Sequence, residues 1–96
     1  MSNVTKLEFL KSKAQNFRAL LNSYNPEPEI QNMLTGFNEL MLVPTINTVL
    51  IPLKNAGKLE QTADQVMSKL KVREAERATV RTKLIRYFEL FIEVAT

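Results

Sequence analysis

The sequence predicts an all-α protein, a helical bundle of three main helices at about residues 5–24, 27–43 and 59–95, with a short kinked helical piece at 45–56. Two observations lead to this prediction. Apolar residues recur at steps of three and four along most of the chain, which is the spacing of one face of an α-helix. The last 37 residues, from Glu60 on, contain neither glycine nor proline, the two residues that most disfavour a helix interior.

The first helix is predicted to begin at Thr5, because Thr5 and Glu8 have the spacing of a capping box. In that motif each side chain bonds a free backbone N–H at the start of the helix. The helix is expected to end near Tyr24, since Asn25 precedes Pro26 and a residue before proline disfavours helical torsions. Its apolar face is predicted to contain Leu7, Leu10, Ala14, Phe17, Leu21 and Tyr24.

The second helix is predicted over residues 27–43. Pro26 and Pro28 suit a first turn, where a missing N–H removes no hydrogen bond, and Pro44 ends the segment. Gly36 lies inside the stripe and is expected to mark a close helix crossing. The apolar stripe consists of Ile30, Met33, Leu34, Phe37, Leu40 and Met41.

Residues 45–56 allow two interpretations. Several apolar residues have helical spacing, but many of the residues here are β-branched, and Pro52 removes a backbone donor. We prefer a kinked helix over a strand because no second strand is predicted that could pair with it. Gly57 is a natural residue to end this piece.

The third helix is predicted over residues 59–95. At about 1.5 Å per residue it would run roughly 55 Å, whereas about 30 Å already spans a small domain. Such a helix must bend, project, or be shared with another molecule. Two apolar stripes on it point the same way: Leu59, Ala63, Val66, Met67 and Leu70, and then Leu84, Ile85, Phe88, Phe91, Ile92 and Ala95.

Between these stripes the same face continues through Arg73, Arg77 and Arg81, which is an unusual place for charged residues. The surrounding window, residues 69–86, holds seven basic residues and two acidic ones, Glu74 and Glu76. In one interpretation the arginine stems cover the stripe while the guanidinium groups reach water or pair with the glutamates. In a second, the helix breaks near residues 72–76. In a third, the window binds phosphates or carboxylates, with the contacts made by Lys69, Arg73, Arg77, Arg81 and Lys83.

The carboxy-terminal end, Leu84 to Ala95, is more apolar than a surface helix requires. Only Arg86, Glu89 and Glu93 interrupt it, so such a helix is expected to be surrounded. It is either the central helix of the bundle or an interface with a partner or a second copy. The predicted interface residues are Leu84, Ile85, Phe88, Phe91 and Ile92.

Composition excludes several classes of function. The 96 residues are expected to form one domain, since domains typically hold about 50–200 residues. There is no cysteine and no histidine, which removes thiol chemistry, the commonest metal ligand and the commonest general acid–base. Glycine-rich phosphate loops are absent as well. We therefore expect no enzyme activity, cofactor, metal site or small-molecule substrate.

The amino terminus has no apolar signal region, and no apolar stretch approaches the roughly 20 residues of a membrane-spanning helix. An intracellular protein without a membrane partner is expected. The first functional hypothesis is a non-catalytic interaction, assembly or adaptor module that self-associates, most simply as a dimer, through the long third helix. The alternative is a protein that binds nucleic-acid phosphates through residues 69–86, which the mild net charge of +3 permits.

Overall fold

The computed structural model describes the backbone of residues 3–95 and the side chains of residues 5–95. Within this part of the chain every regular element is helical and none is a strand, which confirms the all-α prediction. In chain order the elements are α1 (Asn3–Asn22), α2 (Pro28–Thr35), α3 (Leu42–Thr45), the π-helical turn η1 (Ile46–Leu50), α4 (Ile51–Asn55), α5 (Leu59–Lys69) and α6 (Glu74–Ala95).

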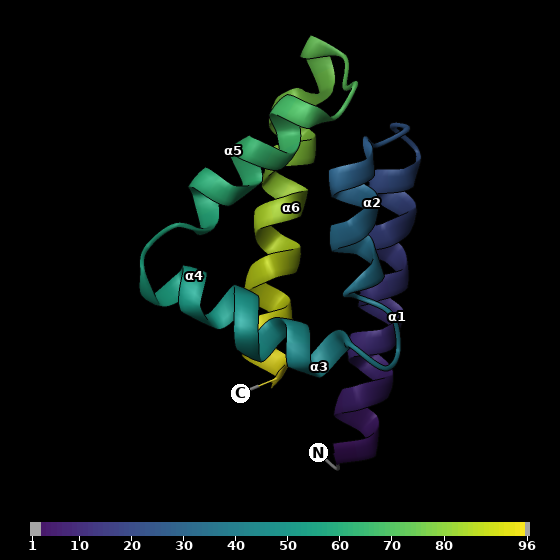
Figure 1. Cartoon of the computed structure of the whole chain (residues 1–96), viewed down its shortest axis with the longest axis vertical. Helices are drawn as coiled ribbons and strands as arrows, with labels where there is room; N and C mark the ends of the chain where they lie inside the picture. Colours follow the sequence, from purple (N-terminus) through teal and green to yellow (C-terminus); the bar gives the residue numbers. More distant parts are fainter. Residues whose placement is uncertain (1–2, 96) are drawn as a thin grey trace.

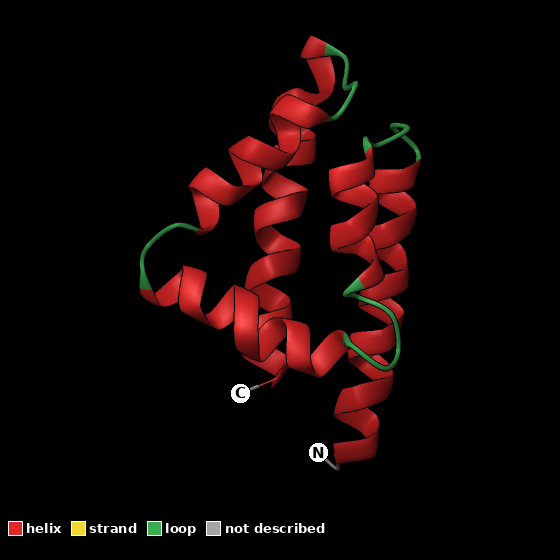
Figure 2. Ribbon diagram, in the orientation of Figure 1, coloured by secondary structure: helices red, strands yellow, loops and turns green. Residues whose placement is uncertain are grey.

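The helices form two layers (Figure 1). One layer holds the two long helices, α1 and α6, which run antiparallel and pack against each other. The other layer consists of α2, the continuous run α3–η1–α4, and α5. Figure 2 shows that short loops join the elements, and that α1 begins and α6 ends at the same end of the molecule.

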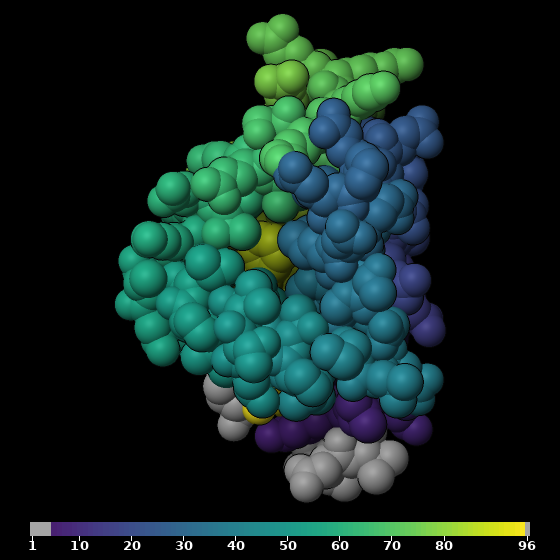
Figure 3. Space-filling model, in the orientation of Figure 1, coloured from purple at the N-terminus to yellow at the C-terminus, as the bar shows by residue number. Residues whose placement is uncertain are grey.

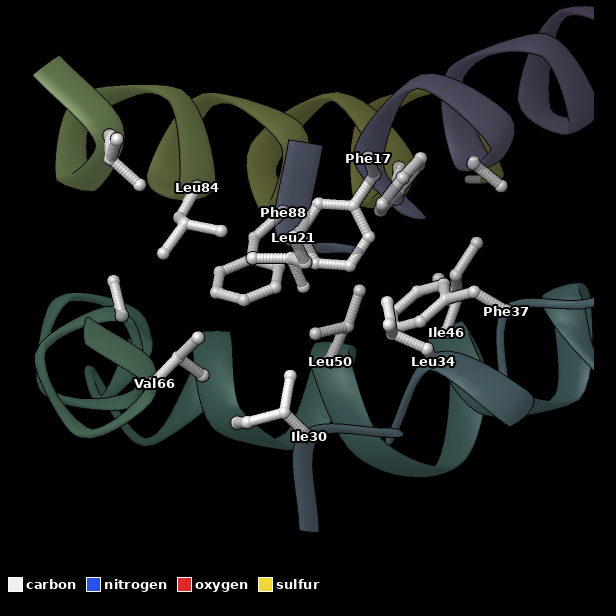
Figure 4. Close-up of a cluster of buried hydrophobic side chains, with 14 of the residues drawn as sticks. Phe17, Leu21, Ile30, Leu34, Phe37, Ile46, Leu50, Val66, Leu84 and Phe88 are labelled. Carbon is white, nitrogen blue, oxygen red and sulfur yellow. The ribbon is translucent and has the colours of Figure 1, made fainter. Parts of the chain in front are cut away.

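The core lies between the two layers. Figure 4 shows Phe17 and Leu21 of α1, with Leu84 and Phe88 of α6, pointing toward side chains of the other layer. Among the described residues every buried side chain is hydrophobic. Because α6 contacts α1, α5 and η1, it is the central helix of the bundle, as its broad apolar surface indicated. The opposing layer contributes Ile30, Leu34, Phe37, Ile46, Leu50 and Val66.

The second helix is shorter than predicted, because α2 ends at Thr35 and not at residue 43. The side chain of Asn38 accepts hydrogen bonds from the backbone N–H groups of Leu40 and Met41, at 2.9 and 3.0 Å, and so turns the chain. The helical stripe is lost beyond this turn. Leu40 is 86% exposed and Met41 48%, whereas Leu42, outside the predicted stripe, is fully buried.

The kinked helical piece is confirmed, although it begins at Leu42 and not at residue 45. At its centre the N–H of Ile51 bonds the carbonyl of Ile46, one residue further back than in an α-helix. The predicted end at Gly57 is confirmed too. Gly57 has a φ of 69°, and the N–H groups of Gly57 and Lys58 bond the carbonyls of Lys54 and Leu53, each at 2.9 Å. This is the hydrogen-bond pattern of a Schellman motif.

The prediction of one continuous third helix over 59–95 was wrong, whereas the second interpretation, a break near residues 72–76, is close to the break at residues 70–73 in the structure. The chain leaves the helix after Lys69 and begins another at Glu74, so that α5 and α6 pack against each other. Leu70 is extended, with φ −91° and ψ 144°, and Leu70 and Val72 are both buried while Lys71 between them is exposed. Burial of these two side chains compensates for the lost helical hydrogen bonds.

One helix start differs from the prediction. α1 begins at Asn3, so Thr5 lies within the helix, whereas α5 begins at Leu59 as predicted and contains Thr62. The hydroxyl of Thr62 donates to the carbonyl of Lys58 at 2.8 Å, which is the bond of a threonine inside a helix.

Candidate functional site

The predicted interface residues of α6 lie inside the core of this chain. Leu84, Phe88 and Phe91 are fully buried, Ile92 is 2% exposed, and Ile85 is half-buried. Their partners are α1, α5 and η1 of the same molecule. The continuous helix that was expected to carry this interface is absent as well. The surface open to another molecule therefore lies elsewhere.

The predicted anion-binding residues do not form one surface. Lys69 makes an ion pair with Glu29 of α2. The Nε atom of Arg81 donates to Oδ1 of Asp64 on α5 at 2.5 Å, with Glu60 close by at 3.9 Å. The hydrogen bond to Asp64 raises the pKa of Arg81 above its ordinary value. Two of the five predicted residues thus hold helices of this chain together.

The other predicted cations lie on separate faces. Arg73 precedes α6 and lines a hollow with Lys71 and Tyr24 at the end of α1. Arg77 lies beside Asp64 and Met67, where α6 meets α5. The interpretation that arginine stems cover the apolar face fits Arg81, which is half-buried, but its carboxylate partners come from α5 and not from the neighbouring glutamates.

A groove between α1 and α6 is lined by three other cations. Its volume is about 420 Å³, and its positive groups are Lys13 of α1 with Lys83 and Arg86 of α6. Its apolar lining comes from Leu20, Tyr87 and Leu90. We call it the α1–α6 groove. Of its residues, only Lys83 belonged to the predicted anion site.

Helix geometry explains why these side chains meet. Lys83, Arg86, Tyr87 and Leu90 are spaced i, i+3, i+4 and i+7, so they share one side of α6 next to its buried face. Lys13 and Leu20, two turns apart, share the facing side of α1. The ring of Tyr87 packs edge-to-face against the buried ring of Phe17, at a centroid distance of 5.6 Å. The groove is therefore attached to the rigid core.

Among the described residues, the cations of the α1–α6 groove have no acidic partner. In the described part of the chain, Lys13, Lys83 and Arg86 make no ion pair, and Nζ of Lys13 lies 5.4 Å from the centroid of the Phe9 ring. By contrast, Lys11 on another side of α1 pairs with Glu39 at 2.5 Å and lowers the pKa of that carboxyl. The groove is thus a local excess of positive charge beside apolar side chains.

A second hollow opens on the other layer (Figure 3). It lies between α2, η1–α4 and α5, with α6 at its base, and its volume is about 230 Å³. We call it the central hollow. Its lining is mainly apolar and includes Phe88 of the buried core.

No cluster of acidic residues in residues 3–95 has the arrangement of a metal site. None of the helices described combines the length and the apolar character needed to cross a bilayer. Comparisons with protein-family models, with curated proteins and with solved structures found no match.

Sequence reasoning missed most of the α1–α6 groove. Arg86 belonged to the predicted basic window and to the polar residues of the carboxy-terminal end but to no predicted site, and Lys13 belonged to none of these groups. One signal was present, because the spacing of Lys83, Arg86, Tyr87 and Leu90 marks a mixed basic and apolar side of a helix. Nothing in the sequence indicated that α1 would provide the facing wall.

Proposed function

We propose that this chain is a non-catalytic interaction module that binds an acidic, amphipathic helix of a partner protein in the α1–α6 groove. The observation that carries the proposal is the set of three cations, Lys13, Lys83 and Arg86, which form no ion pair with any described residue and surround an apolar floor. The absence of histidine and cysteine from the sequence supports a non-catalytic role.

Charge complementarity argues for an acidic partner. Carboxylates placed along the groove would neutralise a positive field that this chain leaves uncompensated. Arg86 can bind a carboxylate through two parallel N–H groups, whereas Lys13 and Lys83 act as point charges. A neutral partner would leave these cations partly desolvated without compensation.

The shape of the groove argues for a helix. It runs between two long antiparallel helices, which is the surface that an amphipathic helix recognises with its apolar face. Leu20, Tyr87 and Leu90 offer a strip of half-buried apolar area for that face. Tyrosine is among the residues that most often dominate binding energy in such interfaces.

Binding of nucleic-acid phosphates is the alternative function. Lys71 and Arg73, which line one hollow at the α5–α6 connection together with Glu76, favour it. Against it, Lys69 and Arg81 are engaged in ion pairs, and the remaining cations lie on different faces. A phosphate backbone would need a continuous basic track to contact all of them.

The test compares two double variants with the same change in net charge. One is Lys83→Glu with Arg86→Glu in the groove, and the control is Lys71→Glu with Arg73→Glu at the α5–α6 connection. The probe is a labelled 20-residue helical peptide with a leucine stripe flanked by glutamates, followed by fluorescence anisotropy at 50 and 200 mM salt. We expect the groove variant to lose at least tenfold in affinity and the control to keep most of it.

Three results would contradict the proposal. They are equal losses in both variants, equal binding of a glutamine version of the peptide, or tighter, steeply salt-dependent binding of duplex DNA or RNA that the control variant abolishes. Sedimentation equilibrium at micromolar concentration tests whether the chain self-associates. A dimer that the groove variant dissociates would replace the partner helix with a second copy of this chain. The intracellular location expected from the sequence stays a prediction.

A further inference from the structure

We propose that the central hollow binds a small, uncharged aromatic molecule that carries one hydrogen-bond donor. This site is separate from the α1–α6 groove and does not depend on the function proposed for it. The groove lies between the two long helices, whereas the central hollow is formed by α2, η1–α4 and α5 over α6 (Figure 3).

The volume of the hollow sets the size of the ligand. At about 230 Å³, it exceeds the roughly 150 Å³ of an engineered cavity that binds benzene. It is smaller than the roughly 300–1,000 Å³ of pockets for drug-sized ligands. A molecule of one or two fused rings fits this range.

The lining argues for an uncharged aromatic ligand. None of the described residues that line the hollow is charged, so an ion would be desolvated there without compensation. The buried rings of Phe37 and Phe88, 2% and 0% exposed, lie behind the apolar wall of the hollow, against which another ring can pack. Met33 supplies a polarizable thioether, which makes favourable contacts with aromatic rings.

Two threonines define the polar requirement. The hydroxyl of Thr45 donates to the carbonyl of Gly36 at 2.6 Å, and that of Thr62 donates to the carbonyl of Lys58 at 2.8 Å. A hydroxyl has one hydrogen to donate and two lone pairs that accept. Since both hydrogens are used, these two oxygens can only accept from a ligand, so a ligand that contacts them has to bring the N–H or O–H. The amide of Asn32, which also lines the hollow, can both donate and accept.

Indole is the probe that tests this chemistry. The chain contains no tryptophan, so indole fluorescence reports the ligand alone, while methyl NMR spectra report the site. We expect saturable shifts at Met33, Val49 and Thr62, with indole bound more tightly than 1-methylindole, which lacks the donor. Indole-3-acetate, which is charged, is expected to bind most weakly. Shifts spread over the whole surface, or equal affinity for all three compounds, would overturn the proposal.

Matched variants locate the site. Thr62→Val removes one acceptor and is expected to lower indole affinity roughly two- to tenfold while leaving 1-methylindole unchanged. Thr48→Val is its control, because the Thr48 hydroxyl makes the same type of bond, to the carbonyl of Pro44 at 2.8 Å, outside the hollow. An equal effect of both variants would count against the site.

A second pair of variants tests whether binding needs the space in the hollow. Val49, at the rim, is 46% exposed, so Val49→Phe is expected to fill the mouth and abolish binding without entering the core. Val43→Phe makes the same change at a position that is 37% exposed and outside the lining, and should leave binding intact. Full indole binding by the Val49 variant would refute the proposal. Tighter binding of N-acetyltryptophan amide than of indole would also refute it, in favour of a side chain from a partner protein.

Discussion

At the scale of single residues, the packing of the bundle centres on Phe17. Its ring is fully buried and meets four other rings edge-on, those of Phe37, Tyr87, Phe88 and Phe91, at centroid distances of 5.2 to 5.7 Å. These rings come from α6 and from the loop after α2, so one side chain of α1 contacts both layers. Edge-to-face pairs add about 0.5–1.5 kcal/mol each beyond the burial of area.

Truncation of this ring should be among the most damaging changes in the chain. Phe17→Ala leaves a large cavity between the layers and is expected to lower the free energy of unfolding by about 3–5 kcal/mol. Urea denaturation followed by circular dichroism measures the change. A loss near 1 kcal/mol would show that the core can close around the missing ring, contrary to the packing described.

Phe9→Ala is the matched control on the same helix. Phe9 is 39% exposed, and the ammonium group of Lys13 lies 5.4 Å from the centroid of its ring. A cation–π contact at an exposed site contributes about 0.5–1 kcal/mol. The two phenylalanines are therefore expected to differ by several-fold in their effect on stability.

At the scale of elements, Gly36 allows α2 and α3 to approach each other. A Cβ atom at this position would lie 2.9 Å from Oγ1 and 3.3 Å from Cγ2 of Thr45. The Thr45 hydroxyl bonds the Gly36 carbonyl, so the contact joins the end of α2 to the end of α3. The structure therefore has a close approach at this glycine, but at the end of α2 and not inside a helix as predicted.

Gly36→Ala is expected to destabilise the protein by about 1–3 kcal/mol, because the methyl group overpacks this contact. The sign of this change in stability is informative, because alanine has a higher intrinsic helix propensity than glycine. Thr45→Ala removes the contacts with Oγ1 and Cγ2 and leaves, of the three nearest atoms, only the Met33 carbonyl oxygen, at 3.3 Å. The double variant should therefore be more stable than the sum of the two single effects predicts. Urea denaturation of all four proteins gives this coupling energy.

Gly57→Ala provides the comparison for that cycle. No atom lies within 4 Å of a Cβ placed there, but the φ of 69° is left-handed and disfavours a side chain. It should cost roughly 1–2 kcal/mol through the backbone alone, and Thr45→Ala should not reduce this cost. If both glycines responded alike to Thr45→Ala, the steric explanation for Gly36 would fail.

At the scale of the whole molecule, folding α5 back onto α6 makes the protein compact. The Cα radius of gyration is 13.0 Å and the longest dimension is 41 Å. A globular domain of this size is expected to have a radius of about 12–13 Å. A continuous third helix would by itself reach about 55 Å.

Small-angle X-ray scattering distinguishes these shapes. Extrapolated to infinite dilution, the data should give a compact particle whose longest dimension exceeds 41 Å only by side chains and hydration. A particle much longer than this, extending well beyond about 55 Å, would contradict the break at residues 70–73. A concentration series separates molecular shape from self-association, which would enlarge the particle as the protein becomes more concentrated.

The sequence by itself determined the helical class and most of the buried faces. The burial of Leu10, Ala14, Phe17 and Leu21 on α1, and of Leu84, Phe88 and Phe91 on α6, followed from periodicity alone. Periodicity is a local property, because a helix presents every third or fourth residue to the same side whatever lies there. The turn at Gly57 was equally local, since it needs one residue that tolerates a left-handed conformation.

Only the tertiary structure decided where the third helix breaks and which surfaces remain open. Residues 70–73 contain no glycine, proline or asparagine, and the charges of Lys69 and Glu74 at the two new helix ends were a weak indication of the break. The chain leaves the helix there because Leu70 and Val72 are buried against the rest of the molecule. The α1–α6 groove and the central hollow likewise join residues from separate helices, and no single stretch of sequence contains the geometry that brings them together.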